Sequence, residues 1–243
     1  MEEKDDVKVS LDKDCISPFW SQFDMILCIK QHTDHRRNST TLFTSMGIPV
    51  EFVTVNNFGR FEAHQQCLKT AYDAGCCNVV IFEDRIDRLN ELSQKQYDDI
   101  THFIHNDKTF DLFFLGAYPN ILFDAALKVN GAIYKVQSPS VHAYVASRKW
   151  MEKMLRINYN LLECPLENIY ALNQNAYCVF PTLFFQTDLT FNESVQFTPI
   201  INKLAIEFKN RYAQHAPVPL LHVLFALFLL LFLIMFLVLF RRR

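Results

Sequence analysis

An apolar run at residues 220–240 constrains this sequence more than any other feature. Within it only His222 is polar, and almost all the other residues are Leu, Ile, Phe or Val. A helix of 21 residues rises about 32 Å, which matches the roughly 30 Å hydrocarbon core of a bilayer. Three arginines, 241–243, follow directly. The run therefore predicts one C-terminal transmembrane helix followed by a basic tail.

The N-terminal residues lack the apolar stretch of a secretory signal. The apolar run would then leave the ribosome last, as in a tail-anchored, single-pass membrane protein, which favours a cytosolic position for the preceding domain. Basic residues lie on both sides of the run, so the positive-inside rule does not decide the orientation. A lipid bilayer is thus an expected partner. Glycosylation of the sequons at Asn38 or Asn192 would instead indicate a luminal domain.

Charge and cysteine usage bound the class of protein. The formal net charge is −2 and no basic run is present, which argues against nucleic acid as a partner. The 7 cysteines follow neither metal nor disulfide spacing, as expected in a reducing compartment. About 200 residues precede the apolar run, which is enough for one sizeable core.

Short apolar runs alternate with helical patterns in the first half of the chain. Strand-like runs lie at 25–29, 51–55, 78–82 and 111–115. Helical patterns separate them at 39–46, 61–72 and 97–104, with Gly47 and Gly75 as helix ends. This order predicts an α/β domain with a mostly parallel sheet, in which the continuously apolar run 78–82 is central. Less regular patterns predict strands at 132–136 and 141–146, helices at 147–156 and 165–172, and an extended segment at 177–185.

A charged loop, residues 83–88, follows the predicted central strand. Ligands of an open α/β sheet bind beyond the carboxyl ends of its strands. The carboxylates of Asp84 and Asp87 could hold Mn²⁺ or Mg²⁺ against a diphosphate, because both ions prefer oxygen ligands. The alternative is a solvated acidic loop without a ligand.

Several segments, taken in order, resemble glycosyltransferase family 25, the lipopolysaccharide and procollagen galactosyltransferase type. The segment NVVIFED is similar to its central strand and acidic motif, MILCIKQHTDHRRNST to its opening strand and arginine-bearing loop, and YCVFPTLFFQ to its ending. The likeness covers residues 25–186. It implies a GT-A-like (Rossmann-like) fold, a nucleotide-diphosphate sugar donor and a protein or glycan acceptor. Compact members occur in large DNA viruses, so a virion membrane is an alternative to the ER or Golgi.

Candidate site residues follow from these positions. His64 and Glu167 lie where the family implies catalytic residues. Candidate contacts to the nucleotide sugar are Arg36, Asp84, Arg85 and Gln186. The alternatives are a packed histidine at 64, a solvated arginine at 36, a carboxylate favoured by the helix dipole at 167, and a buried glutamine bonded to backbone at 186.

The acidic motif departs from the family at Arg85, where a second aspartate is expected. A guanidinium cannot ligate a metal, but it suits bidentate recognition of phosphate. In the plainer alternative, Arg85 points to solvent or pairs with Glu83 or Asp87. Enzymatic activity is therefore left open. The leading hypothesis is a membrane-anchored glycosyltransferase, and the alternative is an inactive binding or scaffold protein of the same fold.

The predicted organisation has five parts. They are a polar leader at 1–21, a family 25-like domain at 22–199, an amphipathic link at 200–219, the transmembrane helix at 220–240 and the basic tail at 241–243.

Overall fold

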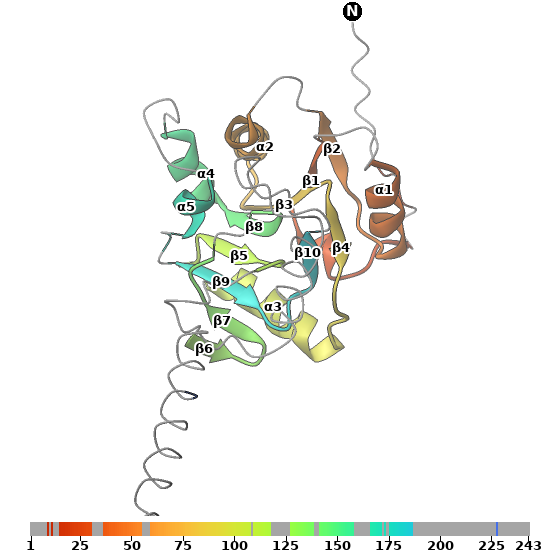
Figure 1. Cartoon of the computed structure of the whole chain (residues 1–243), viewed down its shortest axis with the longest axis vertical. Coiled ribbons are helices and arrows are strands. Elements are labelled where there is room, and N and C mark those ends of the chain that lie inside the picture. The colour runs from red at the N-terminus through yellow and green to blue at the C-terminus, as the bar shows by residue number, and fades with distance from the viewer. Residues whose placement is uncertain are drawn as a thin grey trace, which may run out of the picture.

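The computed structural model of this chain describes residues 9, 11, 15–30, 36–54, 59–107, 109–117, 127–138, 141–157, 166–171, 173, 175–186 and 227. The strands are β1 (Met25–Lys30), β2 (Glu51–Thr54), β3 (Asn78–Glu83), β4 (Ile86–Arg88), β5 (Leu112–Phe114), β6 (Leu127–Asn130), β7 (Ile133–Lys135), β8 (Ala143–Ser147), β9 (Ala176–Val179) and β10 (Phe184–Gln186) (Figure 1). The helices are the 3-10 helix η2 (Trp20–Gln22), α1 (Arg36–Ser45), α2 (Arg60–Asp73), α3 (Gln94–Asn106), α4 (Arg148–Leu155) and α5 (Leu166–Ala171).

The main sheet has the strand order β2-β1-β3-β8-β5-β9-β7-β6, and β4 pairs with β10 in a second sheet. β1 runs parallel to β2 and β3, and β5 runs parallel to β9. β8 and β7 are antiparallel to both of their neighbours. The sheet is thus mixed, with three parallel and four antiparallel pairings. The parallel part predicted for the first half of the chain is present as β2-β1-β3. The four strands expected in the first half are confirmed, although β8 lies between β3 and β5.

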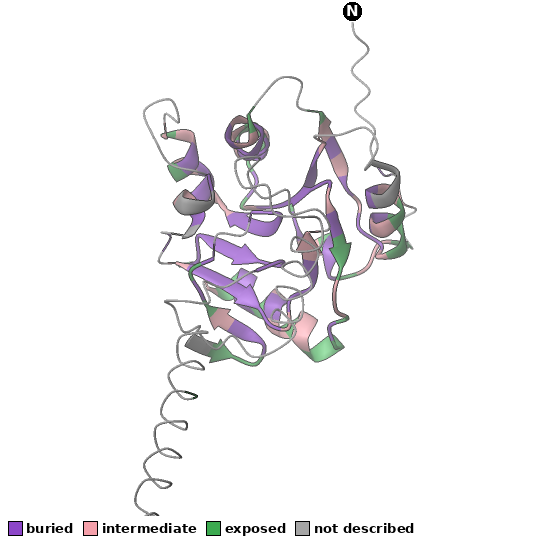
Figure 2. Ribbon diagram, in the orientation of Figure 1, coloured by how far each residue is buried: buried purple, intermediate pink, exposed green. Residues whose placement is uncertain are grey.

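Helices cover both faces of the sheet and enclose two apolar clusters. On β1, Ile26 and Cys28 face the cluster that includes residues of α1 and α3. Leu27 and Ile29 face the opposite cluster, which includes residues of α2, α4 and α5. This alternation follows from the two-residue repeat of a strand. Figure 2 shows the resulting buried centre of the sheet. Gly47 and Gly75 end α1 and α2 with φ of 64° and 81°, as predicted for helix-ending glycines.

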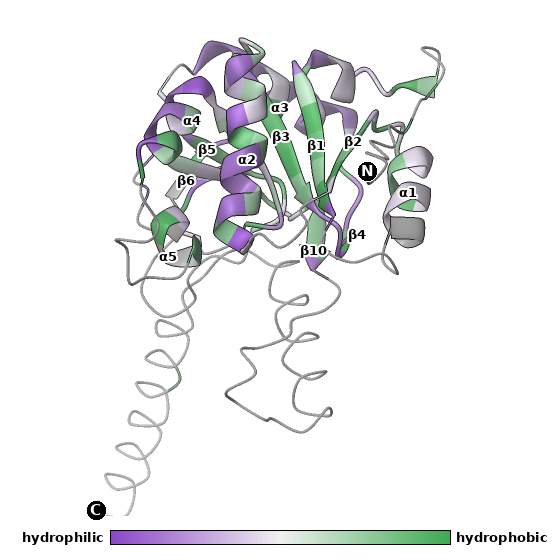
Figure 3. Ribbon diagram, turned by 90° about the horizontal axis from the view of Figure 1, so that it is seen from above, coloured by the Kyte–Doolittle hydropathy of each residue, from purple (hydrophilic) through white to green (hydrophobic). Residues whose placement is uncertain are grey.

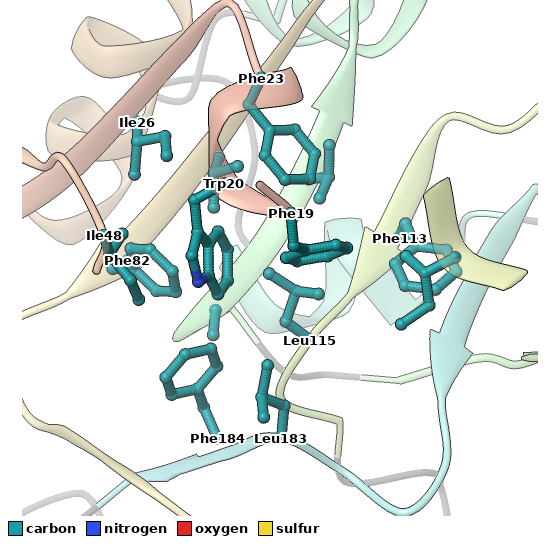
Figure 4. Packing of buried hydrophobic residues seen from close by; sticks show 14 of the residues in the cluster. Phe19, Trp20, Phe23, Ile26, Ile48, Phe82, Phe113, Leu115, Leu183 and Phe184 are labelled. Atoms are coloured by element: carbon teal, nitrogen blue, oxygen red, sulfur yellow. The ribbon is translucent and has the colours of Figure 1, made fainter. Parts of the chain in front are cut away.

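An aromatic cluster places the segment before β1 inside the core. Trp20 is 2% exposed. Its ring centroid lies 4.8 Å from that of Phe19, 6.0 Å from that of Phe82 and 6.2 Å from that of Phe184 (Figure 4). The core therefore begins earlier than the boundary predicted after residue 21, because Phe19 and Trp20 cover one face of the sheet.

The predicted fold class was wrong in its transmembrane part. No helix among the described residues is long and apolar enough to cross a membrane. The longest of them, α2, has 14 residues, and it therefore rises only about 21 Å against a hydrocarbon core of about 30 Å. Residues 187–243, which include the predicted link, membrane helix and basic tail, lie outside the described residues apart from Leu227.

A capping box stabilises the start of α3 and leads to a first prediction. The Gln96 backbone N–H donates to Ser93 Oγ, and the Ser93 backbone N–H donates to Gln96 Oε1 at 2.8 Å. Ser93→Ala should lower the free energy of unfolding by about 1 kcal/mol, because the Gln96 backbone N–H loses its acceptor Oγ and Gln96 Oε1 loses the hydrogen bond from the hydroxyl. Urea unfolding would measure this change. Ser45→Ala, where the hydroxyl donates to the Leu42 carbonyl, is the control and should change stability by less than about 0.5 kcal/mol.

Candidate functional site

The connections around β1 define where a ligand would bind. β1 leads to β2 through α1 on one face of the sheet, and β2 leads to β3 through α2 on the other. From β1 the chain moves to β2 on one side and then returns to form β3 on the other side of β1. The strand order β2-β1-β3 therefore has a topological switch point between the parallel strands β1 and β3. In open α/β sheets such a switch point, at the carboxyl ends of the strands, is the ordinary ligand site. Residues 84 and 85 follow β3 at this point, and the β4–β10 sheet lies beyond it (Figure 3).

The last residue of β3, Glu83, is the centre of a buried polar cluster. Arg60 donates from Nε to Oε1 at 2.6 Å and from Nη2 to Oε2 at 2.9 Å. His64 Nε2 lies 3.0 Å from Oε1, and Gln186 Nε2 donates to Oε2 at 3.2 Å. A carboxylate has only acceptors, so His64 also donates to it. Three side chains from α2 and β10 thus occupy both oxygens of Glu83.

Local geometry explains why these residues meet. Phe82 belongs to the cluster on the α1 side, so Glu83 faces the α2 side, as successive residues of a strand alternate. Arg60 and His64 are four residues apart on α2 and therefore share one helix face. α2 contacts β1 and β3 on this side, and Figure 3 shows it beside β3. The helix and strand together place the N–H donors of both side chains at the carboxyl end of β3.

The polar cluster continues inward through two tyrosines. His64 Nδ1 lies 2.9 Å from the Tyr144 hydroxyl, which lies 2.9 Å from the Tyr170 hydroxyl. All three side chains are fully buried. Burial raises the pKa of Tyr144 and of Tyr170, so both phenols stay protonated at neutral pH. We call Arg60, His64, Glu83, Tyr144 and Tyr170 the Glu83 network.

Glu83 remains ionised although it is buried. Burial by itself would raise its pKa, but the hydrogen bond from His64 and the positive charge of Arg60 lower the pKa of Glu83 to about 2. Arg60 is 35% exposed at its side chain, so the pair reaches the surface at the guanidinium. The Glu83 carboxylate is therefore neutralised by its own neighbours and offers little charge to a ligand.

This shift predicts a pH dependence of stability. The pKa of Glu83 is about 2 in the folded protein against an ordinary value of 4.5. Because the folded pKa is lower, the stabilisation is complete above pH 4.5 and is lost as the pH falls from 4.5 towards 2. A shift of this size corresponds to about 3 kcal/mol. Urea unfolding across this window should show that loss.

Glu83→Gln should reduce the fall in the free energy of unfolding between pH 4.5 and 2, because glutamine keeps the side-chain shape but does not ionise. Glu91→Gln is the matched control, since the Glu91 side chain is 75% exposed and pairs with Arg88 at the surface. If Glu83→Gln and the parent chain lose the same free energy of unfolding on acidification, Glu83 does not cause that loss.

Asp84 and Arg85, two of the predicted nucleotide-sugar contacts, follow β3 at the switch point. Asp84 is buried, and its backbone carbonyl accepts a hydrogen bond from Ser39 Oγ at 2.5 Å. Arg85 is half-buried, and its Nε is a buried donor without a hydrogen-bond partner among the described residues. Arg85 does not pair with Glu83 or Asp87. Glu83 instead binds Arg60, His64 and Gln186. Asp87 Oδ1 accepts a hydrogen bond from the Arg88 backbone N–H.

Of the remaining predicted site residues, Gln186 lies in the polar cluster, Asp87 lies outside it, and two have side chains outside the described part of the chain. Asp87 is exposed on β4 rather than beside buried Asp84. Gln186 reaches the cluster, where it binds the Glu83 carboxylate. Arg36 begins α1 and Glu167 lies in α5, but their side chains are outside the described part of the chain. The described ranges contain no group of three or more His, Cys, Asp or Glu side chains that could hold a metal ion.

Sequence reasoning missed four of the five members of the Glu83 network. Arg60, Tyr144 and Tyr170 were not among the predicted site residues, and Glu83 was treated as part of an acidic loop. The spacing of Arg60 and His64 on one helix was a usable signal, because a basic pair at i and i+4 next to a strand-end carboxylate suggests an ion pair. Tyr144 gave no such signal, since an aromatic residue in an apolar strand is expected to pack in the core.

Comparison with known proteins gives a fold likeness but no family. No protein-family model and no curated protein matches the sequence. Among solved structures, the chain is similar to A197 from STIV, with a TM-score of 0.45 and 7% identity over 72% of this chain and 98% of that one. It is also similar to a glycosyltransferase involved in the glycosylation of the major capsid of PBCV-1, with a TM-score of 0.40 and 9% identity over 76% of this chain and 99% of that one.

A third similar structure is a mutant Drosophila beta-1,4-galactosyltransferase 7 in complex with manganese, UDP-Gal and xylobiose. Its TM-score is 0.37, with 11% identity over 70% of this chain and 77% of that one. Nucleotide-sugar transferases are thus among the solved structures that resemble this chain. All three TM-scores are below 0.5, so these likenesses assign neither a family nor a function. Membership of glycosyltransferase family 25 stays a prediction.

Proposed function

We propose that this chain is a glycosyltransferase-like protein of the family 25 type, which binds a nucleotide-diphosphate sugar at the carboxyl ends of β1 and β3. The observation that carries this proposal is Arg85, a half-buried cation at the switch point whose Nε lacks a partner among the described residues. Arginine is rarely buried without a partner. A diphosphate supplies the anionic oxygens that its guanidinium fork accommodates.

The surroundings of Arg85 support an anionic ligand with hydroxyl groups. Glu83 is already neutralised by Arg60, so it does not compete with a phosphate for Arg85. The Asp84 side chain lies next to Arg85 in sequence and carries carboxylate oxygens that accept hydrogen bonds from hydroxyls. A nucleotide sugar presents both groups, a diphosphate and several hydroxyls. A protein or glycan acceptor would complete the proposed transfer reaction.

A second candidate function is a binding or scaffold protein of the same fold without catalysis. The separation of the two predicted metal-binding carboxylates favours it, because Asp84 is buried while Asp87 is exposed and bonded to backbone. The network also uses Glu83 and His64 in internal contacts. Binding without turnover would distinguish this candidate from the transferase.

Calorimetry of the full chain with a panel of UDP-, GDP-, CMP- and dTDP-sugars, with and without Mn²⁺, tests the proposal. Binding of at least one nucleotide sugar supports it, and release of sugar from the bound donor would support the transferase over the scaffold. Failure of the whole panel to bind under both conditions would refute the nucleotide-sugar site.

A further inference from the structure

We infer that Arg85 binds the diphosphate of the nucleotide directly, without a divalent metal ion between them. This inference rests on the proposed nucleotide-sugar site and specifies how that site recognises its ligand.

The carboxylates near the switch point do not form a ligand set for Mn²⁺ or Mg²⁺. Both oxygens of Glu83 accept hydrogen bonds from protein donors, including the bidentate contact of Arg60. Asp87 is exposed on β4, where its Oδ1 accepts from the Arg88 amide at 2.7 Å. Asp84, the remaining carboxylate between β3 and β4, is buried. Hard cations bind more weakly as the number of anionic oxygens falls.

β-strand pairing holds this arrangement in place. β4 is antiparallel to β10, with Asp87 opposite Phe185 and Ile86 opposite Gln186. Ile86 is buried, so the alternation of the strand directs Asp87 to the outer side. Turning Asp87 towards Asp84 would expose Ile86 and break the ladder. The predicted metal pair Asp84 and Asp87 therefore does not fit the fold.

The charge of Arg85 replaces what a metal would supply. Residue 85 lies in the two-residue connection between β3 and β4, so its position is set by strands on both sides. Its Nε is buried and unpartnered among the described residues. A phosphate oxygen there would accept a charge-assisted hydrogen bond, which is among the stronger contacts that a protein makes. Part of the negative charge of the bound diphosphate would thus be balanced by a side chain that stays protonated.

Titrations of UDP and of GDP into the full chain, in excess EDTA and in Mn²⁺, test this inference. We expect at least one nucleotide to bind in EDTA, with little gain from Mn²⁺. Arg85→Ala should weaken that binding by about tenfold or more, because a hydrogen bond to a charged group is lost. Arg85→Asp should abolish binding in EDTA and restore part of it in Mn²⁺, since it returns a second carboxylate to the motif.

Arg88→Ala is the matched control. Arg88 lies three residues away on β4, and its guanidinium contacts Glu91 at the surface, so its loss should leave nucleotide binding within about twofold. Circular dichroism and urea unfolding would confirm that each variant is folded, and Arg85→Lys, which keeps the charge but loses the fork, should bind with intermediate affinity.

Two results would overturn the inference while leaving the nucleotide site intact. One is binding that requires Mn²⁺ in the parent chain, and the other is equal affinity of folded Arg85→Ala and the parent in EDTA. Absence of binding to every nucleotide in both conditions would instead refute the proposed function, and the inference with it.

Discussion

Replacing His64 with leucine should lower the free energy of unfolding by about 3–5 kcal/mol, the size expected when one partner of a buried hydrogen-bonded charge is removed. The imidazole is fully buried, and its nitrogens lie 3.0 Å from Glu83 Oε1 and 2.9 Å from the Tyr144 hydroxyl. Leucine would fill the space but would leave the carboxylate and the hydroxyl each short of a partner. In urea unfolding, the loss should appear as a lower urea concentration at the midpoint with an unchanged m-value.

His102 on α3 provides the matched control, because its side chain is exposed. His102→Leu should change the free energy of unfolding by less than about 0.5 kcal/mol. An equally small effect of His64→Leu would mean that the Glu83 network contributes little to stability. The double variant His64→Leu with Glu83→Leu should lose less than the sum of the single variants, because it leaves no buried carboxylate unsatisfied.

The same position separates a structural from a catalytic role. His64 was predicted as a catalytic residue, and the structure places both of its nitrogens in internal contacts. His64→Gln keeps hydrogen-bonding groups and should therefore be more stable than His64→Leu. If a nucleotide sugar is turned over, a folded His64→Gln variant with unchanged turnover would support a purely structural role, and a folded variant without turnover would support the catalytic prediction.

Trp20→Ala should lower the free energy of unfolding by about 3–5 kcal/mol through loss of buried area and creation of a cavity. Trp20 is 2% exposed and packs against Phe19, Phe23, Phe82 and Phe184. As Figure 4 shows, these side chains come from the segment before β1, from β3 and from β10, so the cavity would open between elements far apart in the sequence. For a chain of this size, thermal unfolding should shift by roughly 10 °C.

Val129→Ala is the control for this substitution, since Val129 is 49% exposed and its truncation should cost less than about 0.5 kcal/mol. A small effect of Trp20→Ala would show that the segment before β1 is not part of the cooperative core. The folded domain would then begin after residue 21, where the predicted leader ends.

Local pattern predicted much of the fold. The runs that became β1, β3 and β5 were apolar over four or more residues. The helices between the strands had amphipathic spacing, and the first two ended at glycines. The N-terminal cap of α4 is also local, because Ser147 Oγ accepts a hydrogen bond from the Trp150 backbone N–H. These features depend on interactions within a few residues. The transmembrane prediction used the same kind of local pattern, but no described helix has the length or hydropathy to support it.

The sequence by itself therefore determined the α/β class, the central position of β3 and the acidic motif at its carboxyl end. Tertiary structure alone decided that β8 enters between β3 and β5, that Trp20 joins the core, and that Glu83 binds Arg60 and His64 while Arg85 stays without a carboxylate partner among the described residues. The physical reason is distance along the chain. Strand order and side-chain pairing are set by contacts between remote segments, and the short-range periodicity of a sequence carries no record of which remote segments meet.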